Sequence, residues 1–171
     1  MKCLVIAAAA GLLSVAAPAS GQILDISLNG MATYWDTDDF GDAYGGQIGL
    51  EIAFIDWFSA EARTGYLRAE HHDLNIVPIE LMGMFRLSLL DIIEPYAGLG
   101  AGRYFLSSDE IETKDREAIF PLVGLDVHLP TTKITLFGEA RWMFFTDSIS
   151  SDLPSSDLDG LAFSAGLSWS F

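Results

Sequence analysis

Apolar side chains alternate with small or polar ones along most of this chain, and the C-terminal segment shows the pattern most clearly. One face of that segment carries Leu161, Phe163, Ala165, Leu167, Trp169 and Phe171. The other face carries Ala162, Ser164, Gly166, Ser168 and Ser170. A period of two is the spacing of a β-strand, whose successive side chains point to opposite faces. The segment therefore predicts a strand with one greasy face, which suits contact with lipid.

Seven further segments repeat this alternation. With the C-terminal one, the predicted strands cover residues 23–35, 43–54, 58–70, 76–87, 95–105, 119–129, 133–145 and 161–171. Each has about the ~10 residues that a tilted strand needs to cross a membrane. No segment beyond the N-terminal region has the 18 or more consecutive apolar residues of a membrane-spanning helix. The pattern predicts an all-β fold, an eight-stranded antiparallel up-and-down transmembrane β-barrel.

The connections between these strands are predicted to alternate in length. Residues 55–57 and 130–132 are tight turns, and 88–94 is only somewhat longer. The other connections, 36–42, 71–75, 107–118 and 146–160, are predicted to be longer loops. Short turns at one end and longer loops at the other are typical of membrane barrels.

The N-terminus has the features of an export signal. Lys2 precedes an apolar run over residues 4–17, and small residues follow up to Gly21. We therefore predict a cleaved signal peptide at 1–21 and a barrel domain at 22–171. Cys3, the one cysteine of the chain, falls in the signal, so the mature protein is expected to have no disulfide.

The chain is strongly acidic, with 24 Asp and Glu residues against 9 Lys and Arg and a formal net charge of −15. This balance disfavours nucleic acid as a partner, because nucleic-acid binding needs a basic surface. Most of the acidic residues fall in the four predicted loops. Residues 36–42 resemble a calcium loop but lack its fifth-position ligand, and Gln47 stands where its glutamate belongs. We expect solvated loops with no cofactor and no dedicated metal site. Diffuse bridging of divalent cations to lipid phosphates stays open.

The inward faces carry charged residues. They are Glu51, Glu61, Arg63, Glu80, Arg86, Asp126, Glu139 and Arg141. Eight strands leave an interior just wide enough for side chains, and buried charges must pair. If strand parity holds through the first tight turn, Glu51 faces Glu61 and Phe54 faces Phe58. The glycines Gly98, Gly100 and Gly102 leave room that arginine or aromatic side chains should fill. We predict a polar network that plugs the lumen, with a narrow porin-like channel as the alternative.

Two arginines, Arg68 and Arg103, point outward near the loop ends of their strands. They are expected to anchor at the membrane interface or to meet lipopolysaccharide phosphates. Aromatic residues near strand ends predict two interfacial belts. The belt at the loops comprises Tyr34, Trp35, Phe40, Tyr104, Phe105, Phe144 and Phe145; the belt at the turns comprises Phe54, Trp57, Phe58, Trp169 and Phe171.

The signal, the stretch 95–104 and the terminal Leu167-Ser-Trp-Ser-Phe171 together resemble the OmpA-like and OmpX-like eight-stranded barrels. The resemblance covers the whole mature chain and implies a monomer in the bacterial outer membrane. It implies that Leu167, Trp169 and Phe171 form an assembly signal read by the barrel-assembly machinery. It also implies a non-enzymatic structural or surface-interaction role, in envelope integrity or adhesion.

Some barrels of this architecture modify lipid A, which makes the histidines candidate catalytic bases. His71 and His72 fall in a predicted loop, and His128 faces inward without the serine pairing of the deacylases. A lipid A-modifying enzyme is therefore the lesser alternative, and no catalytic residue is assigned. A soluble carrier barrel is disfavoured by the inward Glu and Arg.

Overall fold

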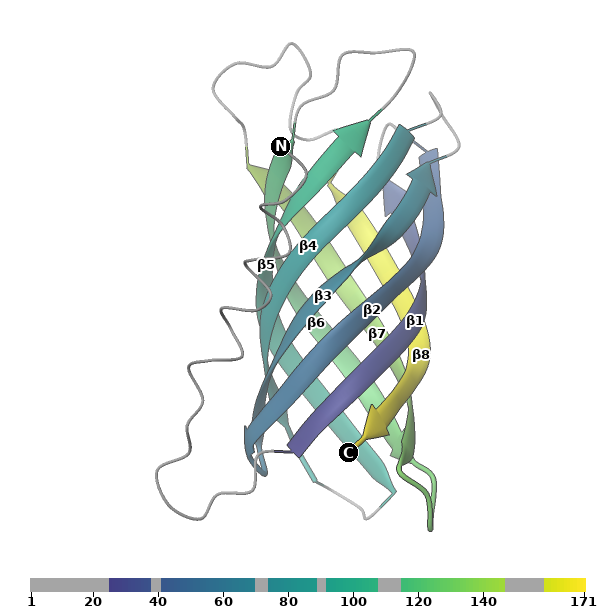
Figure 1. Cartoon of the computed structure of the whole chain (residues 1–171). Coiled ribbons are helices and arrows are strands. Elements are labelled where there is room, and N and C mark those ends of the chain that lie inside the picture. Colours follow the sequence, from purple (N-terminus) through teal and green to yellow (C-terminus); the bar gives the residue numbers. More distant parts are fainter. Residues whose placement is uncertain (1–24, 38–40, 70–73, 89–91, 108–114, 147–158) are drawn as a thin grey trace, which may run out of the picture.

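Eight antiparallel strands close into one barrel (Figure 1). The computed structural model describes residues 25–37, 41–69, 74–88, 92–107, 115–146 and 159–171. The strands are β1 (Asp25–Thr37), β2 (Gly41–Ile55), β3 (Phe58–Ala69), β4 (Leu74–Arg86), β5 (Ile93–Ser107), β6 (Arg116–His128), β7 (Ile134–Thr146) and β8 (Gly160–Ser170). Each strand pairs with its chain neighbours, and β8 closes the sheet against β1. The predicted fold is confirmed; the predicted signal at 1–21 lies outside the described residues.

The barrel has two ends, which we call the turn end and the loop end. The turn end carries the connections after β2, β4 and β6 and the start of β1. The loop end carries the connections after β1, β3, β5 and β7. The strands span 11 to 15 residues, more than the roughly 9–11 that a membrane crossing needs. Their ends therefore extend beyond the hydrocarbon.

The β1–β2 connection is tighter than predicted. Asp36 pairs with Asp42 and Thr37 with Gly41, so the ends of the expected 36–42 loop belong to the strands. Gly41 adopts a φ of 72°, which glycine does without strain, and the Thr37 hydroxyl donates to its carbonyl at 2.6 Å. The expected long loop is wrong here. The connection after β3 is similarly short, so length alternation holds only for the last two loops.

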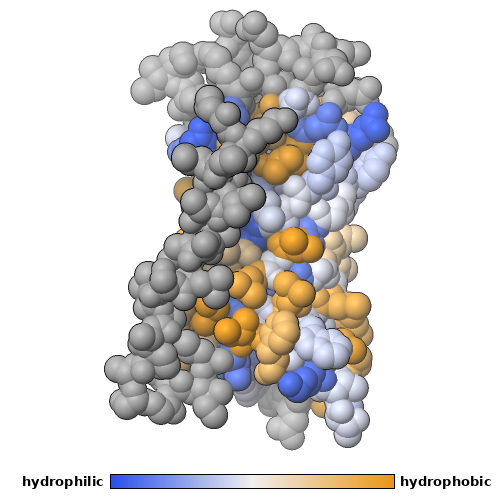
Figure 2. Space-filling model, viewed as in Figure 1, coloured by the Kyte–Doolittle hydropathy of each residue, from blue (hydrophilic) through white to orange (hydrophobic). Residues whose placement is uncertain are grey.

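The wall of the barrel is apolar, and its interior combines buried charged and polar side chains with a cluster of buried apolar ones. Outward side chains of Leu167 and Trp169 are 53% and 51% exposed, whereas Glu139 and Arg141 are buried. On the face shown in Figure 2, hydrophobic side chains gather on the lower part of the wall, with hydrophilic ones most frequent near the loop end. So much exposed apolar surface is rare in a soluble monomer. Across the described ranges, no helix is long and apolar enough to cross a membrane.

The first tight turn contains a register shift. Glu51 faces Glu61 as predicted, but the shift between Ala53 and Ile55 places Phe58 opposite Ile55. The predicted Phe54–Phe58 strand pair is therefore wrong, because a bulge at Phe54 absorbs one residue. The two rings still stack, with their centroids 6.1 Å apart.

Three aromatics assigned to the loop-side belt lie inside the barrel instead. Trp35, Tyr104 and Phe145 are buried and form one cluster. The Trp35 and Phe145 rings stack at 5.5 Å, and Tyr104 meets Phe145 edge-on at 5.0 Å. Whether such an aromatic side chain faces the lumen or the lipid depends on its place in the alternation of its strand and not on how near it lies to the strand end. Tyr34, Phe105 and Phe144 do face outward, whereas Phe40 lies outside the described residues.

The glycine row on β5 receives side chains from the neighbouring strands. A Cβ built on Gly100 would overlap the Phe120 ring, and one on Gly98 would crowd Met84. One on Gly102 would crowd Glu80 and Tyr104. Aromatic side chains lie against Gly100 and Gly102 as expected, and Met84 and Glu80 also contribute to filling this space.

Candidate functional site

The eight inward charged residues predicted from the sequence all face the lumen. We call them, together with the neutral groups that bond to them, the lumen network. The predicted members are Glu51 on β2, Glu61 and Arg63 on β3, Glu80 and Arg86 on β4, Asp126 on β6, and Glu139 and Arg141 on β7. Seven are buried, and Arg86 is half-buried toward the turn end. Their contacts divide the network into three layers along the barrel.

Arg63 holds the central layer together. Its Nε and Nη2 donate to the two oxygens of Glu61 at 3.1 and 3.0 Å. Its Nη1 and Nη2 donate to Glu139, from across the lumen, at 2.8 and 3.4 Å. The Tyr96 hydroxyl also donates to Glu139 at 3.2 Å. One guanidinium thus bridges two buried carboxylates on opposite walls, in the two-pronged geometry that suits arginine.

The loop-side layer is built around Arg141 and Glu80. Arg141 Nη1 donates to Glu80 at 2.7 Å, and the Tyr104 hydroxyl donates to the other Glu80 oxygen at 2.6 Å. Arg141 Nη2 donates to the Gln47 carbonyl oxygen at 3.1 Å. The Arg141 guanidinium also lies over the Phe120 ring, 5.6 Å from its centroid. Polar and aromatic groups therefore fill this cross-section.

The turn-side layer gathers carboxylates around Arg86. Its Nη1 lies 2.7 Å from Glu51, and its Nε lies 3.2 Å from Asp126 and 3.8 Å from Glu94. The Ser59 hydroxyl accepts a further bond from Arg86. Three carboxylates therefore surround one guanidinium, and this layer carries an acidic excess.

Several members of the network were not identified from the sequence. Tyr104 and Glu94 contact charged members directly, and Thr33 and Ser164 bond to each other at 2.9 Å beside Gln47. The alternation of the strands could have shown that these hydroxyl side chains face inward. It could not have shown which residues they bond to, because a neutral side chain has no opposite charge to pair with. Tyr104 was assigned to the interface because it is aromatic and near a strand end.

His128 lies at the turn end, where its side chain is 44% exposed. Its Nδ1 is 2.9 Å from the Thr135 hydroxyl on β7, and its Nε2 is 3.3 Å from the Glu94 carboxylate on β5. These contacts tie the ends of three strands together. His71 and His72 lie outside the described residues.

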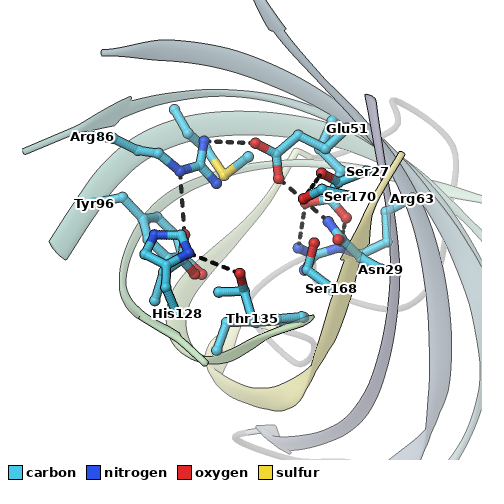
Figure 3. Close-up of a pocket in the computed structure, with 14 residues that line it drawn as sticks. Ser27, Asn29, Glu51, Arg63, Arg86, Tyr96, His128, Thr135, Ser168 and Ser170 are labelled. Carbon is cyan, nitrogen blue, oxygen red and sulfur yellow. Dashed lines mark hydrogen bonds and ion pairs between the residues drawn. The ribbon is translucent and has the colours of Figure 1, made fainter. Parts of the chain in front are cut away.

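A polar cavity of about 80 Å³ opens at the turn end, below the central layer. Figure 3 shows Arg86, Tyr96 and His128 on one side of it and Ser27, Asn29, Ser168 and Ser170 on the other. We call it the turn-end cavity. Its rim residues stand at strand ends, since His128 ends β6 and Ser170 ends β8.

The two outer-wall arginines lie where the sequence placed them. Arg68 and Arg103 are exposed, near the loop ends of β3 and β5. Arg103 pairs with Asp115 at 3.1 Å and lies over the Phe105 ring, 5.6 Å from its centroid. Within the part of the chain that the structure describes, no cluster of three or more His, Cys, Asp or Glu side chains is arranged to hold a metal ion.

The predicted assembly segment forms the closing edge of the barrel. Leu167 and Trp169 point outward on β8, opposite Gly30 and Leu28 of β1. Phe171 follows the strand, is exposed, and its backbone N–H donates to the Ile26 carbonyl at 3.0 Å. The last residue therefore adds a bond to the seam.

A closed barrel with an apolar wall and an ionic lumen defines a transmembrane β-barrel of the outer-membrane class. The chain belongs to the family described as outer membrane protein beta-barrel domain, which matches residues 5–171. It is therefore a bacterial outer membrane protein. In this class short turns face the periplasm and loops face the outside, and we propose the same orientation here, with the turn end periplasmic.

Solved structures share the architecture. OprG from Pseudomonas aeruginosa is 13% identical and superposes with a TM-score of 0.68 over 88% of this chain and 97% of its own. Neisserial surface protein A is 13% identical, with a TM-score of 0.63 over 86% and 97%. Ail, the attachment invasion locus protein of Yersinia pestis, is 14% identical, with a TM-score of 0.54 over 86% and 97%. No curated protein matches the chain.

Proposed function

We propose that this protein is a plugged, non-enzymatic barrel that supports the outer membrane and presents acidic loops for surface interaction, in envelope integrity or adhesion. The observation that carries the first part is the lumen network. In its central layer Arg63 spans the interior between Glu61 and Glu139, with the Tyr96 hydroxyl beside them. We expect such a cross-section to block hydrated ions, since barrels with aqueous channels have about 16 strands.

Conductance tests the plug. The purified full chain is inserted into planar lipid bilayers and recorded at the single-channel level, and we expect no stable conductance. A variant that removes the central bridge, Arg63→Ala with Glu61→Ala and Glu139→Ala, serves as the matched opened barrel and should conduct. Steady conductance of hydrated ions by the unaltered protein would overturn the proposal and favour the narrow porin-like channel, to which the turn-end cavity lends some support.

Surface interaction is supported by the concentration of acidic residues in the segments between the strands at the loop end. Ail is an attachment protein by name, and a barrel of this size can therefore serve such a role. The test compares cells with the native protein and cells in which loop carboxylates are replaced by amides, for binding to host-cell and matrix surfaces. Equal binding by the two kinds of cell would exclude adhesion through the loop carboxylates. The role in envelope integrity would then be tested by comparing the detergent sensitivity of cells with and without the protein.

The lipid A-modifying enzyme is the remaining alternative, since His128 contacts a hydroxyl and a carboxylate. Mass spectrometry of lipid A from cells with and without the protein decides it. We expect identical spectra, and identical spectra again for His128→Ala. A modified lipid A species that is present with the native protein and absent with His128→Ala would overturn the non-enzymatic proposal in favour of a lipid A-modifying enzyme.

Partner contacts complete the proposal. Arg68 and Arg103 are proposed to meet lipid or lipopolysaccharide phosphates at the outer interface; their exposure near the loop ends of their strands supports this, since arginines there can reach the headgroups. Leu167, Trp169 and Phe171 would present the edge that the barrel-assembly machinery recognises. The protein is proposed to act as a monomer, because its sheet is closed on itself and offers no free strand edge.

A further inference from the structure

The turn-end cavity is acidic. Glu51 and Asp126 line it beside Arg86, and Glu94 contacts both Arg86 and His128. Among the described side chains at this end, the three carboxylates contact the single guanidinium of Arg86. With His128 neutral, this group has a formal excess of two negative charges. Arg63 also lines the cavity, but Glu61 and Glu139 already engage it. A cation entering from the periplasm would be attracted here.

Asn29 supplies an independent sign of a ligand. The residue lines the cavity, is only 4% exposed, and its Oδ1 has no hydrogen-bond partner among the described residues. Its Nδ2 lies 3.5 Å from a Glu51 oxygen, and because a carboxylate only accepts, this long contact favours the orientation in which Oδ1 points away from Glu51. A buried acceptor without a donor is costly. The lining of the cavity therefore includes a residue whose buried acceptor lacks a donor.

Several oxygen-bearing side chains line the cavity on the same side as Asn29, although Arg63 also lies there. Ser168 is its register partner on β8, and the Ser27 and Ser170 hydroxyls bond to each other at 3.1 Å on the same side of the cavity (Figure 3). Glu51 uses one oxygen for Arg86, and its other oxygen has only the long contact with Asn29. A metal ion would need several uncommitted carboxylates, and here Arg86 already engages them. An ammonium group needs only a few acceptors at hydrogen-bond distance and a negative surrounding.

We propose that the turn-end cavity binds a small primary ammonium group from the periplasm, which donates to Asn29 Oδ1 and to the Glu51 carboxylate while its charge offsets the carboxylate excess. This site adjoins the plug, because Arg63, Glu61 and Tyr96 also line the cavity, but a ligand entering at the turn end needs no passage through the Arg63 bridge. The ligand class is an amine with a short unbranched end, since the space is about 80 Å³.

Methionine methyl groups give a direct readout. Met84 lines the cavity, whereas Met143 pairs with Gly160 near the loop end and serves as an internal reference. The full chain, labelled with ¹³C at methionine methyls and placed in lipid nanodiscs, is titrated with methylammonium chloride. We expect a saturable shift of the Met84 signal with Met143 unmoved. Tetramethylammonium, which has the charge but no N–H donor, should leave Met84 unmoved at equal ionic strength.

Two variants locate the site. Asn29→Ala removes the unpartnered acceptor and should weaken methylammonium binding about tenfold or more, as expected for a hydrogen bond to a charged group. Asn75→Ala is the matched control, because Asn75 lies at the other end of the barrel, and it should bind as the native chain does. If Asn29→Ala fails to give the heat-modifiable folded form, Ser168→Ala takes its place, with weaker binding expected.

Three results would overturn the proposal. One is a Met84 signal that never moves; another is an equal response to tetramethylammonium or sodium, which would mean screening alone. The third is unchanged affinity in the folded Asn29 or Ser168 variant.

Discussion

At the scale of single residues, Arg63 shows what an ionic interior demands. Its side chain is buried between Glu61 and Glu139, with charge-assisted bonds to both. A buried pair contributes little compared with an apolar replacement, but removing one partner leaves the other charged and unpaired. The arginine is therefore needed mainly because the two carboxylates are there.

Arg63→Met is predicted to destabilise the barrel by about 3–5 kcal/mol, because two buried carboxylates lose their common cation. Urea unfolding in lipid vesicles, followed by tryptophan fluorescence, measures the free energy of unfolding. Adding Glu61→Gln and Glu139→Gln to the same chain should recover much of the loss. Arg68→Met on the outer wall is the control and should shift stability by about 0.5 kcal/mol or less. Equal effects of the two arginine changes would contradict the bridging role.

Two neighbouring glycine positions compare the tightly packed interior of the barrel with its outer wall. A Cβ on Gly124 would overlap the Tyr96 ring, whose hydroxyl bonds to Glu139, whereas one on Gly138 meets nothing within 4 Å. Gly124→Ala is predicted to cost about 1–3 kcal/mol through overpacking. Gly138→Ala should be neutral or slightly stabilising, since glycine weakens a strand. The same unfolding assay checks both, and a harmless Gly124→Ala would mean that the lumen is looser than described.

At the scale of elements, the eight strands could be predicted because alternation survives wherever one face meets lipid. What failed were features that alternation does not carry. The Phe54 bulge shifts register by one residue, and the β1–β2 hairpin tightens through the φ of Gly41. Both depend on local backbone conformation at a strand end, where neither face is constrained by a bilayer.

The lumen network was only partly predictable for a related reason. Parity identified the eight charged residues, but which arginine meets which carboxylate depends on strand tilt and stagger. Glu61 and Arg63 are near in sequence, whereas Glu139 reaches Arg63 from across the barrel. Tyr104 could not be placed for a different reason: an aromatic side chain near a strand end is compatible with both the membrane interface and the barrel interior.

The closing strand carries its own prediction. Deleting Phe171 removes the N–H bond to Ile26 and an exposed aromatic beside the seam, and it should sharply reduce assembly in cells. The measurement is the fraction of heat-modifiable barrel in outer-membrane preparations. Ser170→Ala alters the neighbouring residue but keeps the terminal aromatic, and it should assemble normally. Normal assembly of the deletion would show that Phe171 is not part of the recognition signal.

At the scale of the whole molecule, the barrel differs from a soluble protein because its wall is apolar and its interior buries a charged network beside a cluster of apolar side chains. The wall exposes leucine, isoleucine and aromatic side chains, and the interior holds Glu and Arg. Hydrocarbon outside cannot drive the strands together through the hydrophobic effect, so the backbone bonds of a closed sheet and the lumen contacts must maintain the structure. Tolerance to charge should accordingly depend on depth in the bilayer.

Ile48 and Tyr44 test that dependence on one strand. Both point outward, 61% and 54% exposed, but Ile48 lies mid-strand on β2 and Tyr44 near its loop end. Ile48→Arg is predicted to cost about 2–4 kcal/mol in lipid, whereas Tyr44→Arg should cost about 0–1 kcal/mol because its head reaches the interface. Unfolding from lipid vesicles gives both values. In detergent, whose micelle adapts around a charge, the difference between the two should shrink, and equal costs in lipid would place this wall in water instead of hydrocarbon.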